Sequence, residues 1–198
     1  GNACQHWILE ETTAAGVKLD TSQVYQFQNA NSALYLEVKD ASAEAGANVQ
    51  QWGANGNDCQ NWTLKEFGDG YYYILSRLGD GKTYYLDVAE GKGDDGTNIQ
   101  IFTNTKTSAQ LFKFIPNPDG TYYIVTRASK DKGALGVAAA SKEQGANVLQ
   151  WTKNGSMDQM WNITAIGAIP TPVTTTEPPV VTTEAPTETT TAVPVMTT

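Results

Sequence analysis

The sequence contains Gln60-Asn61-Trp62, Gln110-Leu111-Phe112 and Gln159-Met160-Trp161, three copies of a glutamine followed two positions later by a large aromatic residue. Gln110 lies 50 residues after Gln60, and Gln159 lies 49 residues after Gln110. A near-constant period in a chain of 198 residues indicates one structural unit that is built three times. We call this tripeptide the Gln motif, and its spacing decides the fold.

Two further patterns precede each copy of the Gln motif in the same order. The first is Leu-x-Val, which occurs at Leu36-Glu37-Val38, Leu86-Asp87-Val88 and Leu135-Gly136-Val137. The second is Gly-x-Asn followed by Val or Ile, which occurs at Gly46-Ala47-Asn48-Val49, Gly96-Thr97-Asn98-Ile99 and Gly145-Ala146-Asn147-Val148. We expect the repeated glycine to adopt a backbone conformation that a Cβ atom would disfavour, just before the third strand of its unit.

Short strands separated by turn residues are predicted within each unit. In the second unit, 71–75 is aromatic and β-branched, 78–82 has the composition of a hairpin turn, and 84–88 is the return strand. Further strands are predicted at 96–102 and 110–114. Twelve strands in three sets of four predict an all-β fold: a β-trefoil with pseudo-three-fold symmetry, in which three hairpins cap a six-stranded barrel.

Composition divides the chain into three segments. Residues 24–166 hold the repeats, at about 24–68, 69–118 and 119–166. Residues 167–198 contain six of the eight prolines, much Thr and no aromatic residue, Lys or Arg, which predicts an extended Thr/Pro-rich linker. In the N-terminal segment 1–23, Cys4 to Leu9 resembles Cys59 to Leu64, and we interpret it as the last strand of a preceding similar module or as a strand packed outside the three-fold core. Residues 10–23 are interpreted as a connector.

Charge and composition limit the partners. The net charge of −8 argues against nucleic acid, because phosphate binding depends on Lys and Arg. No stretch is apolar for long enough to span a bilayer, and no signal peptide is expected at Gly1. The Thr/Pro-rich stretch is typical of exported proteins, so a secreted or cell-surface location is expected. Cys4 and Cys59 occupy matching places in a repeat, so they are expected to lie apart in space.

The Gln motif is predicted to be structural. Its aromatic member supplies a large apolar side chain for the core, and its amide can hold a neighbouring loop through both donor and acceptor. The residues assigned to this role are Gln60, Trp62, Gln110, Phe112, Gln159 and Trp161.

Together these patterns, in this order, spacing and copy number, resemble the ricin B-type lectins, which form family 13 among carbohydrate-binding modules. The resemblance covers about Val24 to Ile166. It implies a β-trefoil that binds galactose- or xylose-containing glycans at up to three shallow pockets. In bacteria such modules are often tethered by Thr/Pro-rich linkers to glycoside hydrolases, sometimes in cellulosome-like systems.

The resemblance also implies the residues of each pocket: an acid from the second strand, a Gln and an aromatic from the third, and an Asn just before the Gln motif. The first unit offers Glu37, Gln50, Trp52 and Cys59; the second offers Asp87, Gln100, Phe102 and Ala109; the third offers Gly136, Leu149, Trp151 and Asp158. No set is complete. The second pocket is ranked first because it keeps acid, amide and ring, and the first follows, with Asn55 or Asn57 in place of the missing amide. The third is expected to be weak or empty.

The implied function is a non-catalytic module that targets a secreted bacterial glycoside hydrolase or cellulosome-like protein to plant cell-wall polysaccharide. The alternative is a degenerate trefoil with a structural or protein-docking role. Catalysis would need two carboxylates, for which Asp87 with Asp94 and Asp95, or Asp58 with Glu37, could be nominated, but no nucleophile or base motif accompanies them. No cofactor or metal site is predicted, since Asp94 and Asp95 lack the ligand spacing of a calcium loop.

Overall fold

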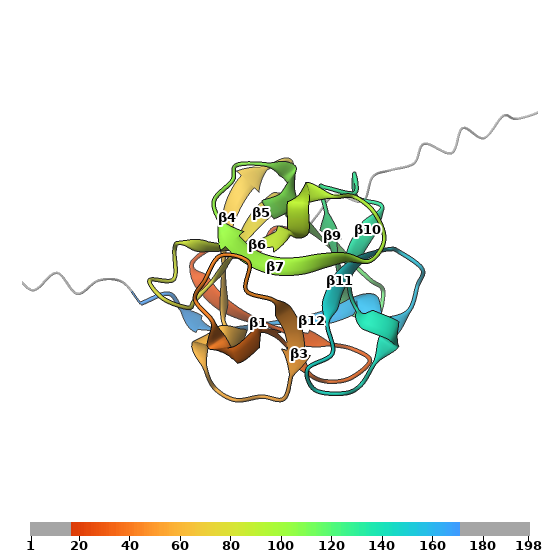
Figure 1. Cartoon of the computed structure of the whole chain (residues 1–198), viewed down its shortest axis with the longest axis horizontal. Helices are drawn as coiled ribbons and strands as arrows, with labels where there is room; N and C mark the ends of the chain where they lie inside the picture. Colours follow the sequence, from red (N-terminus) through yellow and green to blue (C-terminus); the bar gives the residue numbers. More distant parts are fainter. Residues whose placement is uncertain (1–16, 171–198) are drawn as a thin grey trace, which may run out of the picture.

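The computed structural model describes residues 17–170, and their regular secondary structure consists of strands and short 3-10 turns (Figure 1). Each of the three units contains four strands and two short 3-10 turns. The strands are β1 (Gln23–Asn29), β2 (Tyr35–Val38), β3 (Val49–Trp52), β4 (Trp62–Gly68), β5 (Tyr71–Ser76), β6 (Tyr84–Val88), β7 (Thr97–Thr103), β8 (Phe112–Pro116), β9 (Tyr122–Thr126), β10 (Gly133–Val137), β11 (Val148–Thr152) and β12 (Met160–Ala168). The turns are η1 (Lys39–Ala41), η2 (Asp58–Gln60), η3 (Ala89–Gly91), η4 (Ser108–Gln110), η5 (Ala138–Ala140) and η6 (Met157–Gln159). Within the described residues no helix has the length to cross a membrane.

Six of the strands close into a barrel. β1 pairs with β12 and β4, β5 pairs with β4 and β8, and β9 pairs with β8 and β12, so the ring has no free edge. The other six strands form the hairpins β2–β3, β6–β7 and β10–β11. Figure 1 views the molecule from the side where these hairpins meet. The predicted all-β trefoil of three four-stranded units is therefore confirmed.

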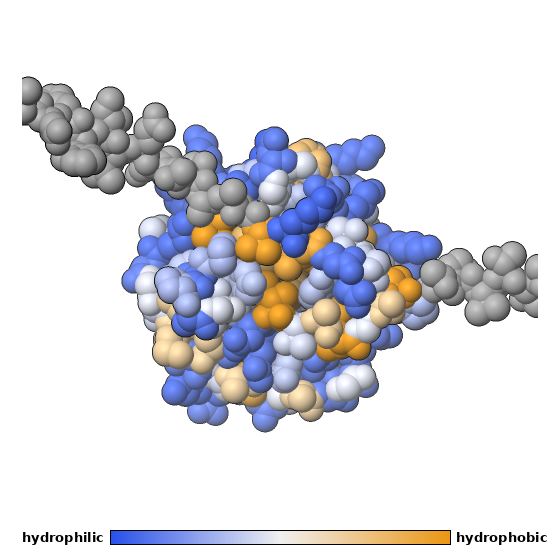
Figure 2. Space-filling model, turned by 180° about the vertical axis from the view of Figure 1, so that it is seen from behind, coloured by the Kyte–Doolittle hydropathy of each residue, from blue (hydrophilic) through white to orange (hydrophobic). Residues whose placement is uncertain are grey.

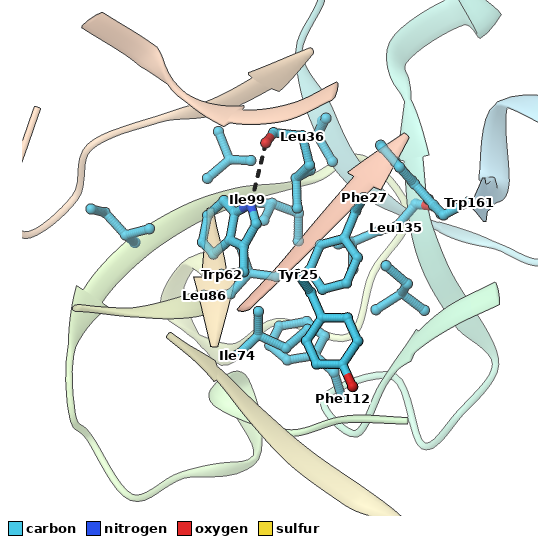
Figure 3. Close-up of a cluster of buried hydrophobic side chains, with 14 of the residues drawn as sticks. Tyr25, Phe27, Leu36, Trp62, Ile74, Leu86, Ile99, Phe112, Leu135 and Trp161 are labelled. Atoms are coloured by element: carbon cyan, nitrogen blue, oxygen red, sulfur yellow. Dashed lines mark hydrogen bonds between the residues drawn. The ribbon is translucent and has the colours of Figure 1, made fainter. Parts of the chain in front are cut away.

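The aromatic members of the Gln motif lie in the barrel core. Trp62, Phe112 and Trp161 have no exposed surface, and they pack with Phe27 and Phe114 in one apolar cluster (Figure 3). The indole Nε1 of Trp62 donates to the Leu36 carbonyl at 3.2 Å, and that of Trp161 donates to the Leu135 carbonyl at 3.0 Å. These bonds satisfy the indole N–H groups that burial would otherwise leave unpaired.

The glutamines of the motif each bridge the loop that precedes them. In every unit the side-chain oxygen accepts a main-chain N–H five residues earlier, from Asn55, Thr105 or Asn154, at 2.9–3.2 Å. The amide nitrogen donates to a carbonyl seven residues earlier, on Gly53, Thr103 or Thr152, at 2.8–3.0 Å. The glutamine thus holds its loop, as predicted from the residue type.

The strand predicted at 110–114 begins later than expected. Gln110 ends the 3-10 turn η4, and β8 starts at Phe112; Gln60 and Gln159 likewise end η2 and η6. The amide must point back across its own loop to make both hydrogen bonds, and a turn supplies that direction where an extended strand does not. The other strands predicted in the second unit lie within two residues of β5, β6 and β7.

Asparagines from the three units meet in a closed ring. Asn48 donates to Asn147, Asn147 to Asn98 and Asn98 to Asn48, each from Nδ2 to Oδ1 at 2.9 Å. These residues precede or begin the third strand of each unit, where Gly46, Gly96 and Gly145 have φ of 88°, 83° and 81°. That left-handed conformation is the one expected for the repeated glycine. The ring joins the three hairpins to one another.

The ends of the trefoil extend slightly beyond the expected bounds. β1 begins at Gln23, and β12 continues to Ala168, two residues past the boundary predicted at Ile166. The reason is the ladder between these strands, in which Gln23 pairs with Ala168. The predicted strand at Cys4–Leu9 and the predicted linker after residue 170 lie outside the described residues.

Part of the expected connector is ordered against the barrel. The Val17 N–H donates to the Phe114 carbonyl at 3.1 Å, and the Leu19 N–H donates to the Tyr72 hydroxyl at 3.0 Å. Leu19 also packs against the core cluster.

Figure 2 shows apolar side chains gathered in the centre of the face opposite the hairpins.

The asparagine ring predicts a non-additive effect on stability. Asn98→Ala leaves one donor and one acceptor of the ring unpaired, so we expect the free energy of unfolding in urea to fall by about 1–3 kcal/mol. Asn48→Ala should cost a similar amount, and the double variant should cost less than the sum because the first change already breaks the ring. Asn162→Ala is the control, since this exposed asparagine lies on β12 outside the ring and should change stability by less than about 0.5 kcal/mol. Strict additivity of Asn48→Ala and Asn98→Ala would contradict a cooperative ring.

Candidate functional site

Each hairpin carries one candidate pocket on its outer side. Within the hairpins, Glu37 is paired with Gln50, and Asp87 is paired with Gln100. Directly opposed residues project to the same face of a sheet, so each acid meets the amide predicted to accompany it. In the third hairpin Gly136 is paired with Leu149, which brings neither group.

The second pocket is the largest of the three, with a volume of about 500 Å³. It brings together Asp87, Gln100 and Phe102, as predicted, and the Gln100 amide donates to Asp87 Oδ1 at 2.9 Å. Ala109 lies in its wall at the place where the family pattern has an asparagine. The small side chain opens space, and the pocket is completed by residues that the sequence reasoning did not name: Glu90, Gly91, Thr105, Thr107 and Ser108.

Burial shifts the pKa of the Asp87 carboxyl. The residue is 4% exposed, and its burial raises the pKa of the carboxyl above the ordinary value of 3.8. The hydrogen bond from the Gln100 amide acts in the opposite direction, because it stabilises the ionised form, and the neighbouring Gln110 side chain adds to this effect. In its ionised form the group can accept hydrogen bonds from a ligand.

The first pocket is smaller, about 220 Å³, and its acid is already surrounded by donors. Glu37 accepts hydrogen bonds from Gln50 at 3.1 Å, Asn55 at 2.7 Å and Gln60 at 2.8 Å. Asn55, one of the two residues expected to stand in for the missing amide, therefore bonds to the acid of its own pocket, and its Oδ1 accepts the Asn57 N–H. Asn57 also lines the pocket.

Trp52 completes the first pocket and depends on the neighbouring unit. Its indole is 40% exposed, which suits a ring that stacks on a ligand. A Cβ atom on Gly145, in the third unit, would lie 3.5 Å from Cζ3 of Trp52, and one on Gly96 would lie 3.7 Å from Cζ3 of Trp151. The repeated glycines thus also bring each exposed Trp against the next unit, a role that sequence reasoning did not identify.

The third pocket is an open cavity, although its unit lacks the acid and the glutamine of the family pattern. It has a volume of about 350 Å³ and is lined by Val137, Leu149, Trp151 and Asp158, among others. Trp151 is 45% exposed, as a stacking ring would be. Neither the acid nor the glutamine of the family pattern is present, and Asp158 carries the carboxylate.

Two of the loop acids nominated for catalysis or calcium are hydrogen-bonded within the protein. Asp95 Oδ1 accepts the main-chain N–H of Thr152 at 2.6 Å and its hydroxyl at 2.8 Å, and Asp58 accepts from Asn61 at 3.1 Å. Among residues 17–170, no three His, Cys, Asp or Glu side chains are grouped so that they could hold a metal ion. Cys59 is buried beside Asn55, and burial raises the pKa of its thiol.

Solved structures share this fold. A designed three-fold symmetric protein, ThreeFoil, is 34% identical, with a TM-score of 0.67, over 71% of this chain and 96% of its own. An exo-β-1,3-galactanase from Clostridium thermocellum is 30% identical, with a TM-score of 0.68, over 73% of this chain and 30% of that chain.

Sequence comparisons agree with the structural ones. The alpha subunit of clotting factor G from Tachypleus tridentatus is 36% identical over 69 residues, which is 34% of this chain and 10% of that protein, so this chain spans only a small part of its curated relative. The model of the ricin-type β-trefoil lectin domain-like family matches residues 3–102, 80–151 and 108–172. The chain therefore belongs to the ricin-type β-trefoil lectin domain-like family.

Proposed function

We propose that this chain is a non-catalytic carbohydrate-binding module whose principal site is the second pocket. The observation that carries the proposal is the arrangement of Asp87, Gln100 and Phe102 around one hollow of about 500 Å³. Carboxylate and amide together accept from and donate to a vicinal pair of hydroxyls, and an aromatic ring stacks on the apolar face of a sugar. The family to which the chain belongs is one of lectin domains.

The ligand class we favour is a galactose- or xylose-containing glycan of the plant cell wall. Support comes from the galactanase of C. thermocellum, a protein named for action on a galactose polymer, which is 30% identical to this chain over the aligned trefoil. We assign the chain to family 13 of carbohydrate-binding modules. Its role would be to bring a tethered, secreted glycoside hydrolase or cellulosome-like protein to its polysaccharide, with residues 171–198 as part of the linker.

A second role is favoured for the first pocket. Three amides already donate to Glu37, so a sugar must displace at least one of them, or bind beside them. This arrangement supports the alternative of a structural or docking role for that part of the surface.

Weak single sites gain strength on a polymer when two pockets bind at once, because the second contact is intramolecular.

Removing the carboxylate of the second pocket tests the principal site. Asp87→Asn keeps the size of the side chain but removes its charge, and we expect about a tenfold or greater loss of affinity, since hydrogen bonds to charged groups are the stronger ones. The measurement is calorimetry or NMR titration with galactose, xylose and short galactan and xylan oligosaccharides. Glu66→Gln, at an exposed position on β4, is the charge-matched control and should bind as the unchanged protein does. Equal affinity of Asp87→Asn for every binding glycan would remove this pocket from the proposal.

Acidification should weaken the second pocket at an unusually high pH. The raised pKa of Asp87 means that this carboxyl takes up its proton at a pH above 3.8, and the protonated form loses an acceptor for the sugar. In a Trp52→Ala background, which disables the first pocket, affinity should fall as the pH is lowered, with a midpoint above 3.8. The same titration in Trp52→Ala/Asp87→Asn should be flat over that range. A midpoint at or below 3.8 would show that burial does not control this site.

Trp52→Ala should distinguish polymer binding from monosaccharide binding. If the first pocket adds a second contact on a polymer, the variant should lose retardation in affinity electrophoresis on galactan or xylan gels, while its affinity for a monosaccharide at the second pocket stays unchanged. Phe67→Ala is the matched control, since this exposed aromatic side chain lies on β4 and lines none of the three pockets. Identical retardation of Trp52→Ala and the unchanged protein on every gel would assign the first pocket to the structural role.

A further inference from the structure

The third pocket has its carboxylate in the place left by the missing acid. A Cβ atom built on Gly136 would lie 3.3 Å from Asp158 Oδ2 and 3.0 Å from Cγ of Gln159. Asp158 therefore fills the space where the side chains of Glu37 and Asp87 begin in the other units. Its main chain is fixed, because the Asn29 amide donates to the Asp158 carbonyl at 2.7 Å. Units one and two have an acid on the second strand and a small residue, Cys59 or Ala109, just before the Gln motif. In the third unit the small residue, Gly136, is on the strand, and the acid, Asp158, precedes the motif.

The surroundings of this carboxylate differ from those of the other two. Glu37 receives three side-chain donors and Asp87 receives the Gln100 amide. Among residues 17–170, no hydrogen-bond donor or cation lies within bonding distance of the Asp158 carboxylate, whose residue is only half-buried. Its lone pairs are thus open to the pocket.

No amide stands in this pocket at the position that Gln50 and Gln100 occupy in the other two. Leu149 replaces the amide of Gln50 and Gln100, and Val137 adds apolar surface. Asn154, Ser156 and Gln159 also line the pocket, but none of these side chains donates to Asp158. The exposed face of the Trp151 indole attracts cations. A carboxylate with no donor, an indole face and apolar walls favour a ligand that carries positive charge and several donors.

We propose that the third pocket binds the protonated amine of an amino sugar. An ammonium group has three donors and a full charge, so it can bond to Asp158 while it lies over the face of Trp151. A neutral sugar hydroxyl supplies only one donor and no charge, and Leu149 offers its oxygen no amide donor of the kind that Gln50 and Gln100 provide. The volume of about 350 Å³ is of the size that small-molecule sites have. The chain would then carry two kinds of site, for neutral sugars and for de-N-acetylated ones.

The two tryptophans that are exposed within residues 17–170 allow the test to be made pocket by pocket. Trp52 and Trp151 lie in the first and third pockets, and their indole N–H signals in a ¹H–¹⁵N NMR spectrum can be assigned with Trp52→Phe and Trp151→Phe. D-galactosamine and D-glucosamine hydrochloride are titrated against galactose, glucose and the N-acetylated sugars at equal ionic strength. We expect the Trp151 signal to shift with at least one amine, with an affinity about tenfold or more above that of its neutral counterparts.

Asp158→Asn is the decisive variant. It should abolish the preference for the amine at Trp151 while the responses of Trp52 and the position of the buried Trp161 signal remain unchanged, which shows that the fold is retained. The triple variant Gly136→Asp/Leu149→Gln/Asp158→Ala copies the second unit and should lose the preference as well. Equal shifts with charged and neutral sugars, no shift with any of them, or an amine preference that survives Asp158→Asn would each overturn the proposal. None of these outcomes depends on the second pocket, whose function is tested separately with Asp87→Asn.

Discussion

The paired hydrogen bonds of the three motif glutamines are the interaction on which the pockets depend. Each amide bonds to one main-chain N–H and one main-chain carbonyl of the preceding loop. These loop groups are thereby paired although no neighbouring strand reaches them. Two positions later an aromatic side chain enters the core, which fixes the glutamine in turn. The residue just before the glutamine is thereby held over the hairpin, whatever its identity. A strong scaffold of this kind makes that position free to vary, and Cys59, Ala109 and Asp158 show that it has varied.

Symmetry is kept where the units must fit one another and lost where they face solvent. The barrel closes only if all three units supply the same strands, and the ring of Asn48, Asn98 and Asn147 needs one amide from each. No such requirement acts on the outer side of the hairpins. There the acid is Glu37 in one unit and Asp87 in the next, and in the third it comes from a different part of the chain. Fold and binding are therefore under separate physical constraints.

Much of this arrangement could be predicted from the sequence, because a pattern repeated three times is a strong signal. The repeat gave twelve strands, the barrel and the structural role of the Gln motif, and it placed Asp87 beside Gln100. What it could not supply were the contacts that individual side chains make across the loops. β8 starts after Gln110 because the Gln110 amide bonds across its own loop. Asp158 lies over Gly136, 22 residues earlier, in space that a Cβ atom at that position would crowd. Aligning the repeats column by column treats Gly136 as a lost acid and so hides the exchange.

The three pockets also differ in what a ligand must displace. In the first, the carboxylate is fully engaged by amides, so a sugar exchanges one set of hydrogen bonds for another and the net gain is small. In the second, one amide donates to Asp87 and open space remains, so new bonds can be added to those already present. In the third, the carboxylate has no donor within the described chain, and an apolar wall strengthens any charge interaction made there. The number of internal donors around each acid, more than the identity of the acid itself, thus sets the chemistry that each pocket can select.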